Sequence, residues 1–227
     1  MAEEKNQIAK SLSLSVGPSI APYILPEFIK HYRKDYPEVS LSIQEMKSEE
    51  MFTVLKNGEI DVGIAVSDQL RKGILEIPLY TERFYVYLSE ACWRKLPVFK
   101  PENLEHESMW IMKEAQCLRD SAFSFCKARS KGQHIYEAGS IDTLIRIVDN
   151  NGGFTIIPEM HLAFLSEAQR KNVRKIDGDH LSQRRISLYI REDCIKERML
   201  NTIVDCMKEF MPSQMMNEGV WKYGVRL

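Results

Sequence analysis

The chain has 227 residues, of which 44% are hydrophobic and 28% are charged, and its formal net charge is −1. This length suits one large domain or two small lobes, and the near-neutral charge gives no sign of a nucleic-acid-binding face. No apolar run reaches the roughly eighteen residues of a membrane span, and the polar first residues do not resemble a signal peptide.

The first part of the chain alternates strand and helix patterns. Apolar residues predict strands over residues 11–16, 39–43 and 60–66, the last of them nearly continuous as in a buried parallel strand. Two helices are predicted between them, and the second covers 49–56 and is closed by Asn57-Gly58.

The first of these helices follows the turn at residues 17–23, and Pro22 suits its first turn. Pro26 is expected to mark the start of regular helix. An apolar stripe at helical spacing is formed by Leu25, Phe28, Ile29 and Tyr32.

The remaining elements continue this alternation. Strands are predicted over residues 75–79, 83–88, 109–112, 134–138, 154–157 and 186–190. Ser140 is expected to cap a helix that runs through Val148, Pro158 to open another helix, and residues 195–210 to form a long amphipathic helix before a tail at 211–227. This order predicts an α/β fold with two Rossmann-like lobes.

The chain is expected to cross from one lobe to the other and back again, which divides it, with its N-terminal linker, into four parts. Residues 1–10 are expected to be a residual linker, 11–85 the first part of regulatory lobe I, 86–187 lobe II, and 188–227 the return to lobe I with its last helix.

Five cysteines with no framework spacing indicate a reducing compartment, and we expect a cytoplasmic protein. Cys92, Cys194 and Cys206 are expected to be packing residues. Cys117, Cys126 and His134 are too widely spaced for a typical structural zinc site, so no metal is predicted. No phosphate-binding loop, serine-hydrolase or metalloprotease motif is present, and no cofactor is predicted.

The stretch from Gln116 to Cys126 is predicted to be a short helix, because Leu118, Ala122 and Phe125 recur at helical spacing. Cys117 and Cys126 are nine positions apart, which in a helix means about 13–14 Å along the axis and opposite sides. A disulfide requires Cα atoms within about 7 Å, so these cysteines can bond only if the helix melts.

Two interpretations of this stretch stay open on spacing alone: two inert buried thiols, or a redox switch. For a switch, a thiolate at Cys117 would be stabilised by the helix N-terminus and Arg119, with Asp120 as a capping partner. Peroxide would oxidise Cys117 to a sulfenic acid, which would condense with Cys126.

The run Cys-Leu-Arg-Asp followed by Phe-Cys at residues 117–126 resembles the redox segment of OxyR, the peroxide-sensing group of LysR-type transcription regulators. Gln116 departs from the histidine often found there. The resemblance, which extends from about residue 12 to 208, implies that Cys117 reacts with peroxide and Cys126 resolves the product, with Arg119 and Asp120 as matching neighbours. It also implies the periplasmic-binding-protein-like arrangement of LysR effector domains.

Further expectations follow from the same resemblance. The chain would be the regulatory part of a homodimeric or tetrameric regulator that controls oxidative-stress genes. Promoter DNA would be bound through a winged helix-turn-helix that this chain lacks. Hydrogen peroxide would oxidise the domain and a cellular thiol would reduce it, so the chain would be a stoichiometric sensor and not an enzyme.

Four further residues are candidates for a pocket at the carboxyl ends of strands, between the lobes. Ser19 resembles the threonine of a family turn, with helix capping as the alternative. Ser140 and Thr143 open a helix whose free amides could hold a polar ligand, and plain capping is again the alternative. Arg185 matches a pocket arginine of OxyR, with a solvated charge as the alternative.

Other functions remain open at this point. A LysR-type domain could bind a small organic effector, with the cysteines incidental. A thiol-peroxidase-like enzyme and a free-standing solute-binding protein are weaker alternatives.

Overall fold

The computed structural model describes residues 10–67, 71–95, 108–112, 133–136, 140–176, 183–194 and 196–226. The chain folds into a mixed α/β structure with two compact units. Unit 1 consists of Met1–Thr81 and Arg185–Leu227, and unit 2 of Glu82–Arg184. Among the helices of the described ranges, none combines the length and apolar character that a bilayer crossing demands.

Unit 1 is built on a sheet whose neighbouring strands follow the order β2-β1-β3-β9-β4. These strands are β1 (Ser11–Val16), β2 (Ser40–Glu45), β3 (Val62–Val66), β4 (Ile74–Leu88) and β9 (Gln183–Arg191). β1 is parallel to both β2 and β3, whereas β3 is antiparallel to β9. The carboxyl ends of β1 and β3 therefore lie at the same edge of the sheet.

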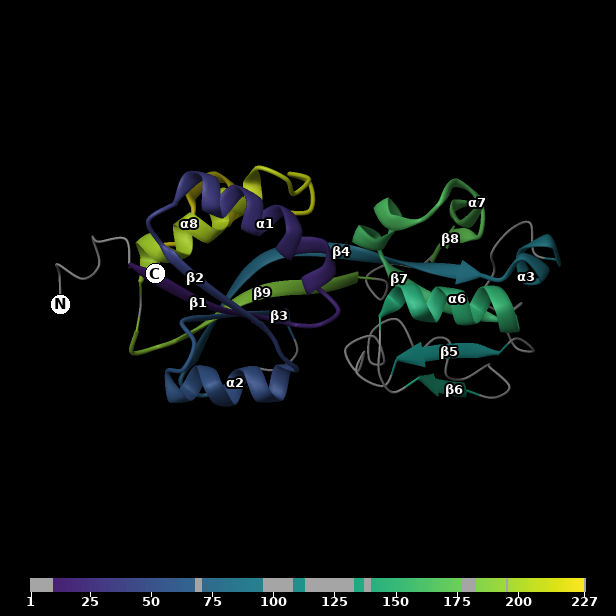
Figure 1. Ribbon diagram of the computed structural model, residues 1–227, viewed down its shortest axis with the longest axis horizontal. Coiled ribbons are helices and arrows are strands. Elements are labelled where there is room, and N and C mark those ends of the chain that lie inside the picture. Colours follow the sequence, from purple (N-terminus) through teal and green to yellow (C-terminus); the bar gives the residue numbers. More distant parts are fainter. Residues whose placement is uncertain are drawn as a thin grey trace. The chain divides into compact units, whose positions relative to one another are not determined.

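Helices cover both faces of this sheet (Figure 1). α1 (Ala21–Asp35) and α8 (Glu197–Lys208) lie on one face, and α2 (Ser48–Asn57) lies on the other. The hydroxyls of Tyr32 and Thr202 are 3.1 Å apart and join α1 to α8 within the core. The predicted amphipathic last helix therefore does pack against the first lobe, although it is shorter at each end than expected.

In α1 and α2 of unit 1, one local sequence signal agrees with the structure and another does not. Gly58 ends α2 with φ 76°, a left-handed conformation that glycine adopts without the steric cost of a side chain. The expectation for Pro26 was wrong, because α1 begins at Ala21 and continues through this residue. Pro26 is the sixth residue of α1 and has no N–H to donate to the Pro22 carbonyl, so the helix continues without that one hydrogen bond.

Three other predicted elements differ from the structure. The predicted strands 75–79 and 83–88 are one continuous strand, β4. Pro158 does open a helix, since it is the N-cap of η3 (Glu159–Phe164), but this helix is of the 3₁₀ type and Pro158 is also the last residue of β7 (Phe154–Pro158). The predicted tail contains α9 (Glu218–Tyr223), whose first turn is capped by the side chain of Asn217.

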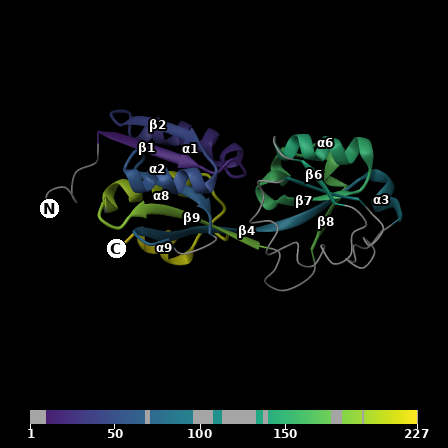
Figure 2. The same ribbon diagram turned by 90° about the horizontal axis from the view of Figure 1, so that it is seen from below.

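Unit 2 has a second sheet whose neighbouring strands follow the order β4-β7-β5-β6, with β8 also paired to β4. Its elements are α3 (Glu90–Lys95), β5 (Met109–Met112), β6 (Gln133–Tyr136), α6 (Ile141–Asn151), β7 (Phe154–Pro158), η3 (Glu159–Phe164), α7 (Glu167–Arg170) and β8 (Val173–Lys175). β5 is parallel to both β6 and β7. α6 packs along β5 and β7 through its buried side, and Figure 2 shows it along the sheet.

Candidate functional site

The cysteine segment falls outside the described residues, and so do its four candidate site residues, Cys117, Arg119, Asp120 and Cys126. The strands on either side of it are β5 and β6, parallel neighbours with Met109 opposite Gln133 and Met112 opposite Tyr136. β5 is held at its centre by Trp110. Its indole N–H donates to the Gly152 carbonyl at 2.9 Å, and its carbonyl accepts from the Thr155 hydroxyl at 2.9 Å.

Ser140 and Thr143 form the start of α6 in unit 2. The Ser140 hydroxyl oxygen accepts the backbone N–H of Thr143 at 3.3 Å, and the two hydroxyl oxygens are also 3.3 Å apart. Ser140 is therefore the N-cap of the helix. Both side chains are half-buried, so this end of α6 presents two hydroxyls and one acidic residue, Asp142.

Ser19 lies in the turn that joins β1 to α1 in unit 1. The turn is closed by the amides of Ile20 and Ala21, which donate to the Gly17 carbonyl at 2.9 and 3.0 Å. Ile20, and not Ser19, occupies the N-cap position of α1, and its side chain makes no capping hydrogen bond. The Ser19 side chain is half-buried.

Arg185 lies inside β9 and not before it. Its guanidinium Nη2 donates to the Ser67 hydroxyl oxygen at 2.8 Å and lies 3.4 Å from Oε1 of Glu76. The Ser67 hydroxyl in turn donates to the same carboxylate oxygen at 2.5 Å, and the Ser187 hydroxyl does so at 2.8 Å. Arg185 is thus ion-paired and hydrogen-bonded, while its side chain remains 54% exposed.

The backbone brings these unit 1 residues to one edge of the sheet. The Gly17 amide, which opens the turn of Ser19, donates to the Ile64 carbonyl of β3 at 2.9 Å. Ser67 follows the last residue of β3, and its amide donates to the Arg185 carbonyl at 2.8 Å. Ser19, Ser67 and Arg185 therefore all lie near the carboxyl ends of β1 and β3, where open α/β sheets commonly bind ligands.

Ser67, Glu76 and Ser187 were not predicted as site residues. Glu76 and Ser187 interrupt apolar strands, Glu76 within Ile74-Leu75-Glu76-Ile77, and Ser67 directly follows another apolar strand. A carboxylate in such a run signals either an exposed position or a polar partner, since an unpaired buried charge is costly. The partners lie 9 to 118 positions away along the chain, which is why this local signal could not identify them.

The remaining cysteines are free thiols. Cys92 and Cys206 are buried and Cys194 is half-buried. Burial, with Asp35 and two acidic residues of the α8 end nearby, raises the pKa of the Cys206 thiol to about 12. Over the described ranges, no three His, Cys, Asp or Glu side chains come together as a metal site would require.

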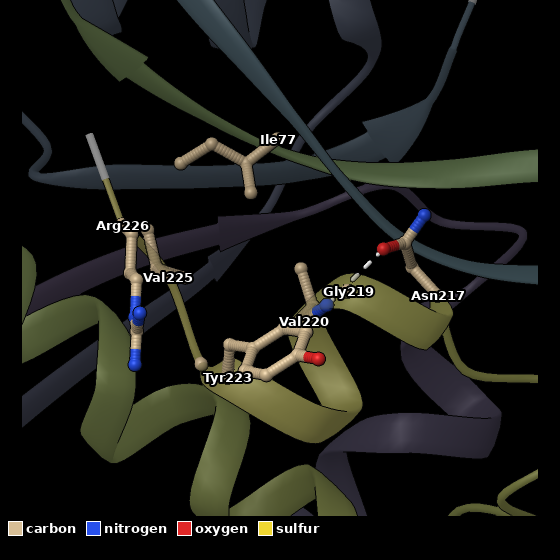
Figure 3. A pocket seen from close by; sticks show the side chains of 8 residues that line it. Ile77, Asn217, Gly219, Val220, Tyr223, Val225 and Arg226 are labelled. Carbon is tan, nitrogen blue, oxygen red and sulfur yellow. Dashed lines mark hydrogen bonds between the residues drawn. The ribbon is translucent and has the colours of Figure 1, made fainter.

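A surface cavity of about 370 Å³ lies in unit 1 between β4 and α9 (Figure 3). Its walls are formed by Ile77, Asn217, Gly219, Val220, Tyr223, Gly224, Val225 and Arg226. None of the candidate residues lines it, so it is separate from the polar cluster around Arg185.

Comparisons with known proteins agree with this architecture. Residues 5–212 match the family described as LysR substrate binding domain. The hydrogen peroxide-inducible genes activator of Haemophilus influenzae is 29% identical over 146 residues, which are 62% of this chain and 47% of that protein. The chain thus spans about half the length of this curated relative.

Two further relatives cover more of the chain. The HTH-type transcriptional regulator EstR of Acinetobacter baylyi is 23% identical over 207 residues, 91% of this chain and 69% of that protein. The crystal structure of OxyR from Porphyromonas gingivalis superposes with a TM-score of 0.80 at 27% identity, covering 91% of this chain and 95% of that one. The family match and the shared fold together establish that this chain belongs to the LysR substrate binding domain family and is an OxyR-like effector domain.

Proposed function

We propose that this chain is the redox-sensing regulatory domain of a LysR-type transcription regulator, with Cys117 and Cys126 as its switch. The observation that carries the proposal is the pair of cysteines nine positions apart, in the order Cys-Leu-Arg-Asp and then Phe-Cys, within an OxyR-like effector domain. Relatives that are named as hydrogen peroxide-inducible genes activators support it.

The chemistry proceeds in two balanced steps. The Cys117 thiolate attacks one peroxide oxygen, the O–O bond breaks, and hydroxide leaves, which becomes water once protonated. Cys117 is then a sulfenic acid. The Cys126 thiolate attacks the Cys117 sulfur, the S–O bond breaks, hydroxide leaves and takes up a solvent proton to give a second water, and a disulfide forms. Two molecules of a cellular thiol return both cysteines to the reduced state by thiol–disulfide exchange.

The other candidate residues support this chemistry in the proposed site. Arg119 stabilises the thiolate and the departing hydroxide, because both species are anionic. Asp120 orders the start of the segment, and Ser140 and Thr143, which belong to the same unit, offer hydroxyls that can hydrogen-bond peroxide. The chain acts once per oxidation event and is a sensor, not a turnover catalyst.

The proposed output is a change in assembly and DNA binding. Bonding Cys117 to Cys126 is incompatible with the helix predicted across both residues, so forming the disulfide would unwind that predicted helix. In a homodimer or tetramer, such a rearrangement would reposition DNA-binding domains carried elsewhere in a longer regulator and so change promoter binding. Two points support this step: regulators of this family act as dimers, and the curated relatives are longer than this chain.

Peroxide titration with disulfide mapping tests the proposal. The reduced chain is mixed with one equivalent of hydrogen peroxide, quenched with an alkylating agent and analysed by mass spectrometry. The expected product contains a Cys117–Cys126 bond that dithiothreitol reverses. Cys117→Ser should abolish it, Cys126→Ser should stop at the sulfenic acid, and the matched control Cys194→Ser should behave like the wild type.

Free Cys117 and Cys126 after this treatment would refute the proposal. The alternative is a domain that binds a small organic effector, which predicts a thermal shift with a metabolite and none with oxidant. Many turnovers with a thiol reductant would instead identify a peroxidase.

A further inference from the structure

The cavity between β4 and α9 of unit 1 has apolar walls and a single charged end (Figure 3). Ile77 of β4 lies on one side of it, and Val220 and Tyr223 of α9 lie on the other. Arg226 stands at one end and Asn217 at the opposite end. Because Ile77 and Val220 are buried while Tyr223 is 64% exposed, the first two form the floor of the cavity and Tyr223 lies at its rim.

The walls of the cavity are fixed to the rest of unit 1 at both ends of α9. Before the helix, the Asn217 amide donates to the Leu79 carbonyl of β4 at 2.8 Å. After the helix, the Asn201 side chain of α8 accepts the Val225 amide at 2.8 Å and donates to the Val225 carbonyl at 3.2 Å. Fixed walls favour binding, because little conformational entropy is lost when a ligand enters.

Two glycines shape the cavity. Apart from its own helix, a Cβ at Gly219 would meet only the Asn217 side-chain oxygen within 4 Å, so this position faces open space. Gly224 has φ 69° and approaches Asn201 so closely that a side chain would collide with it. The cavity volume of about 370 Å³ falls within the range of about 300–1,000 Å³ that is usual for small-ligand pockets.

The charge at the rim comes from Arg226, the one charged residue among those that line the cavity. Its guanidinium carbon lies 5.5 Å from the centroid of the Tyr223 ring, which attracts the cation through its π-electrons. In the part of the chain that the structure describes, no carboxylate forms an ion pair with Arg226. A ligand anion at this end would therefore meet a cation for which no described carboxylate competes.

We propose that this cavity binds a small aromatic carboxylate. The ring of the ligand occupies the apolar space between Ile77 and Val220, where the Tyr223 ring offers an aromatic partner. The carboxylate accepts hydrogen bonds from Arg226, whose planar set of donors matches two carboxylate oxygens. All residues of this site belong to unit 1, and none is a candidate residue of the cysteine switch, so the site does not depend on the proposed function.

An NMR titration with phenylacetate as the probe tests this site. Amide spectra of the ¹⁵N-labelled, reduced full chain should show saturable shifts at Ile77 and at residues 217–226, with a dissociation constant of about 1 mM or lower. Phenylacetamide keeps the ring and the shape but lacks the charge, and acetate keeps the charge but lacks the ring. Each should bind about tenfold more weakly than phenylacetate.

Two substitutions separate the charge from the space. Arg226→Gln should weaken phenylacetate binding about tenfold and leave phenylacetamide binding unchanged. Gly219→Leu places a side chain in the open space and should abolish binding of both probes. Lys222→Gln is the matched control, because it removes one positive charge from the same helix at a position that pairs with Glu218 and does not line the cavity. It should bind phenylacetate like the wild type.

Shifts that do not saturate, or that lie away from β4 and α9, would overturn the proposal. Equal weakening in Arg226→Gln and Lys222→Gln would also overturn it, because a general charge effect would then explain the binding. Equal affinity for phenylacetate and phenylacetamide would refute the carboxylate. Urea midpoints show whether each variant is folded, and if Gly219→Leu is not, the exposed substitution Arg226→Gln decides.

Discussion

Nη2 of Arg184 lies 2.7 Å from Oε1 of Glu82, and both side chains are buried, with exposures of 1% and 0%. Nε of Arg184 donates to the same oxygen at 2.7 Å, and the Met160 amide donates to Oε2 at 3.2 Å. Glu82 and Arg184 are the first and last residues of unit 2. This buried pair therefore ties together the two strands through which the chain enters and leaves that unit.

Breaking this pair from one side should destabilise the protein strongly. Glu82→Ala removes the carboxylate that accepts two hydrogen bonds from the buried Arg184 guanidinium, and we expect the free energy of unfolding to fall by about 3–5 kcal/mol. Urea unfolding monitored by circular dichroism measures this fall in the free energy of unfolding. The exposed ion pair of Arg191 and Asp193 provides the control, and Asp193→Ala should leave the midpoint nearly unchanged.

Replacing both partners distinguishes an unpaired charge from lost packing. The double variant Glu82→Met/Arg184→Met removes both charges while keeping the volume, so it should recover most of the stability that Glu82→Ala loses. If the double variant is as unstable as Glu82→Ala, the stability of the wild type depends mainly on the hydrogen bond from the Met160 amide to Glu82 and not on charge compensation.

This pair also explains one failure of the sequence-based prediction. The polar run Thr81-Glu82-Arg83 indicates an interruption between two strands. The sequence therefore predicts two strands where the structure has one continuous strand, β4. The burial of Glu82 becomes tolerable only through Arg184, 102 positions away, which no local pattern reveals. Signals confined to a few residues, such as Gly58 after α2, were predicted correctly because their cause is local.

The candidate site residues fall into the same two groups, those that neighbouring residues identify and those that depend on distant partners. The cysteine motif and the cap at Ser140 are encoded by neighbouring residues and could be identified from the sequence. The partnership of Arg185 with Ser67 and Glu76 depends on the order of strands β3, β9 and β4, which hydrophobic patterns do not determine.

Ser140 allows the capping role to be separated from a role in the proposed site. Ser140→Ala removes the acceptor for the Thr143 amide and should lower the free energy of unfolding by about 0.5–2 kcal/mol. Ser140→Asp keeps an acceptor and should keep most of the stability. If Ser140 also binds peroxide, Ser140→Asp should slow oxidation of Cys117 while the unfolding midpoint stays high. Equal oxidation rates in the wild type and Ser140→Asp would leave Ser140 with the capping role alone.

His161 should make unit 2 sensitive to acid. The imidazole is buried in η3, and burial lowers its pKa below the ordinary value near 6.5, although Asp142, 3.8 Å from Nε2, opposes this shift. In the unfolded chain the same imidazole is protonated at a higher pH. As pH falls through about 6.5 towards the folded-state pKa, the unfolded chain takes up more protons and stability is lost.

Urea midpoints measured from about pH 7.5 to about pH 5 test this expectation. His161→Gln should show a smaller loss of stability over this range than the wild type, whatever its stability at neutral pH. His31→Gln, in α1 of unit 1, is the control and should retain the wild-type loss. An unchanged slope in His161→Gln would mean that other groups cause the acid sensitivity.

Cys206 should remain unreactive under conditions that modify a sensing thiol. With its pKa raised to about 12 by burial and nearby acidic residues, only about one thiol in ten thousand is ionised at about pH 8. Iodoacetamide added to the native reduced chain should therefore leave Cys206 unlabelled, and urea should be needed to expose it. Peptide mass spectrometry follows each cysteine separately in the same sample.

Cys206→Ala should preserve the peroxide response, because a thiol that is neither ionised nor exposed cannot compete for peroxide. Early labelling of Cys206 in the folded chain would show that α8 opens more readily than its packing against α1 implies.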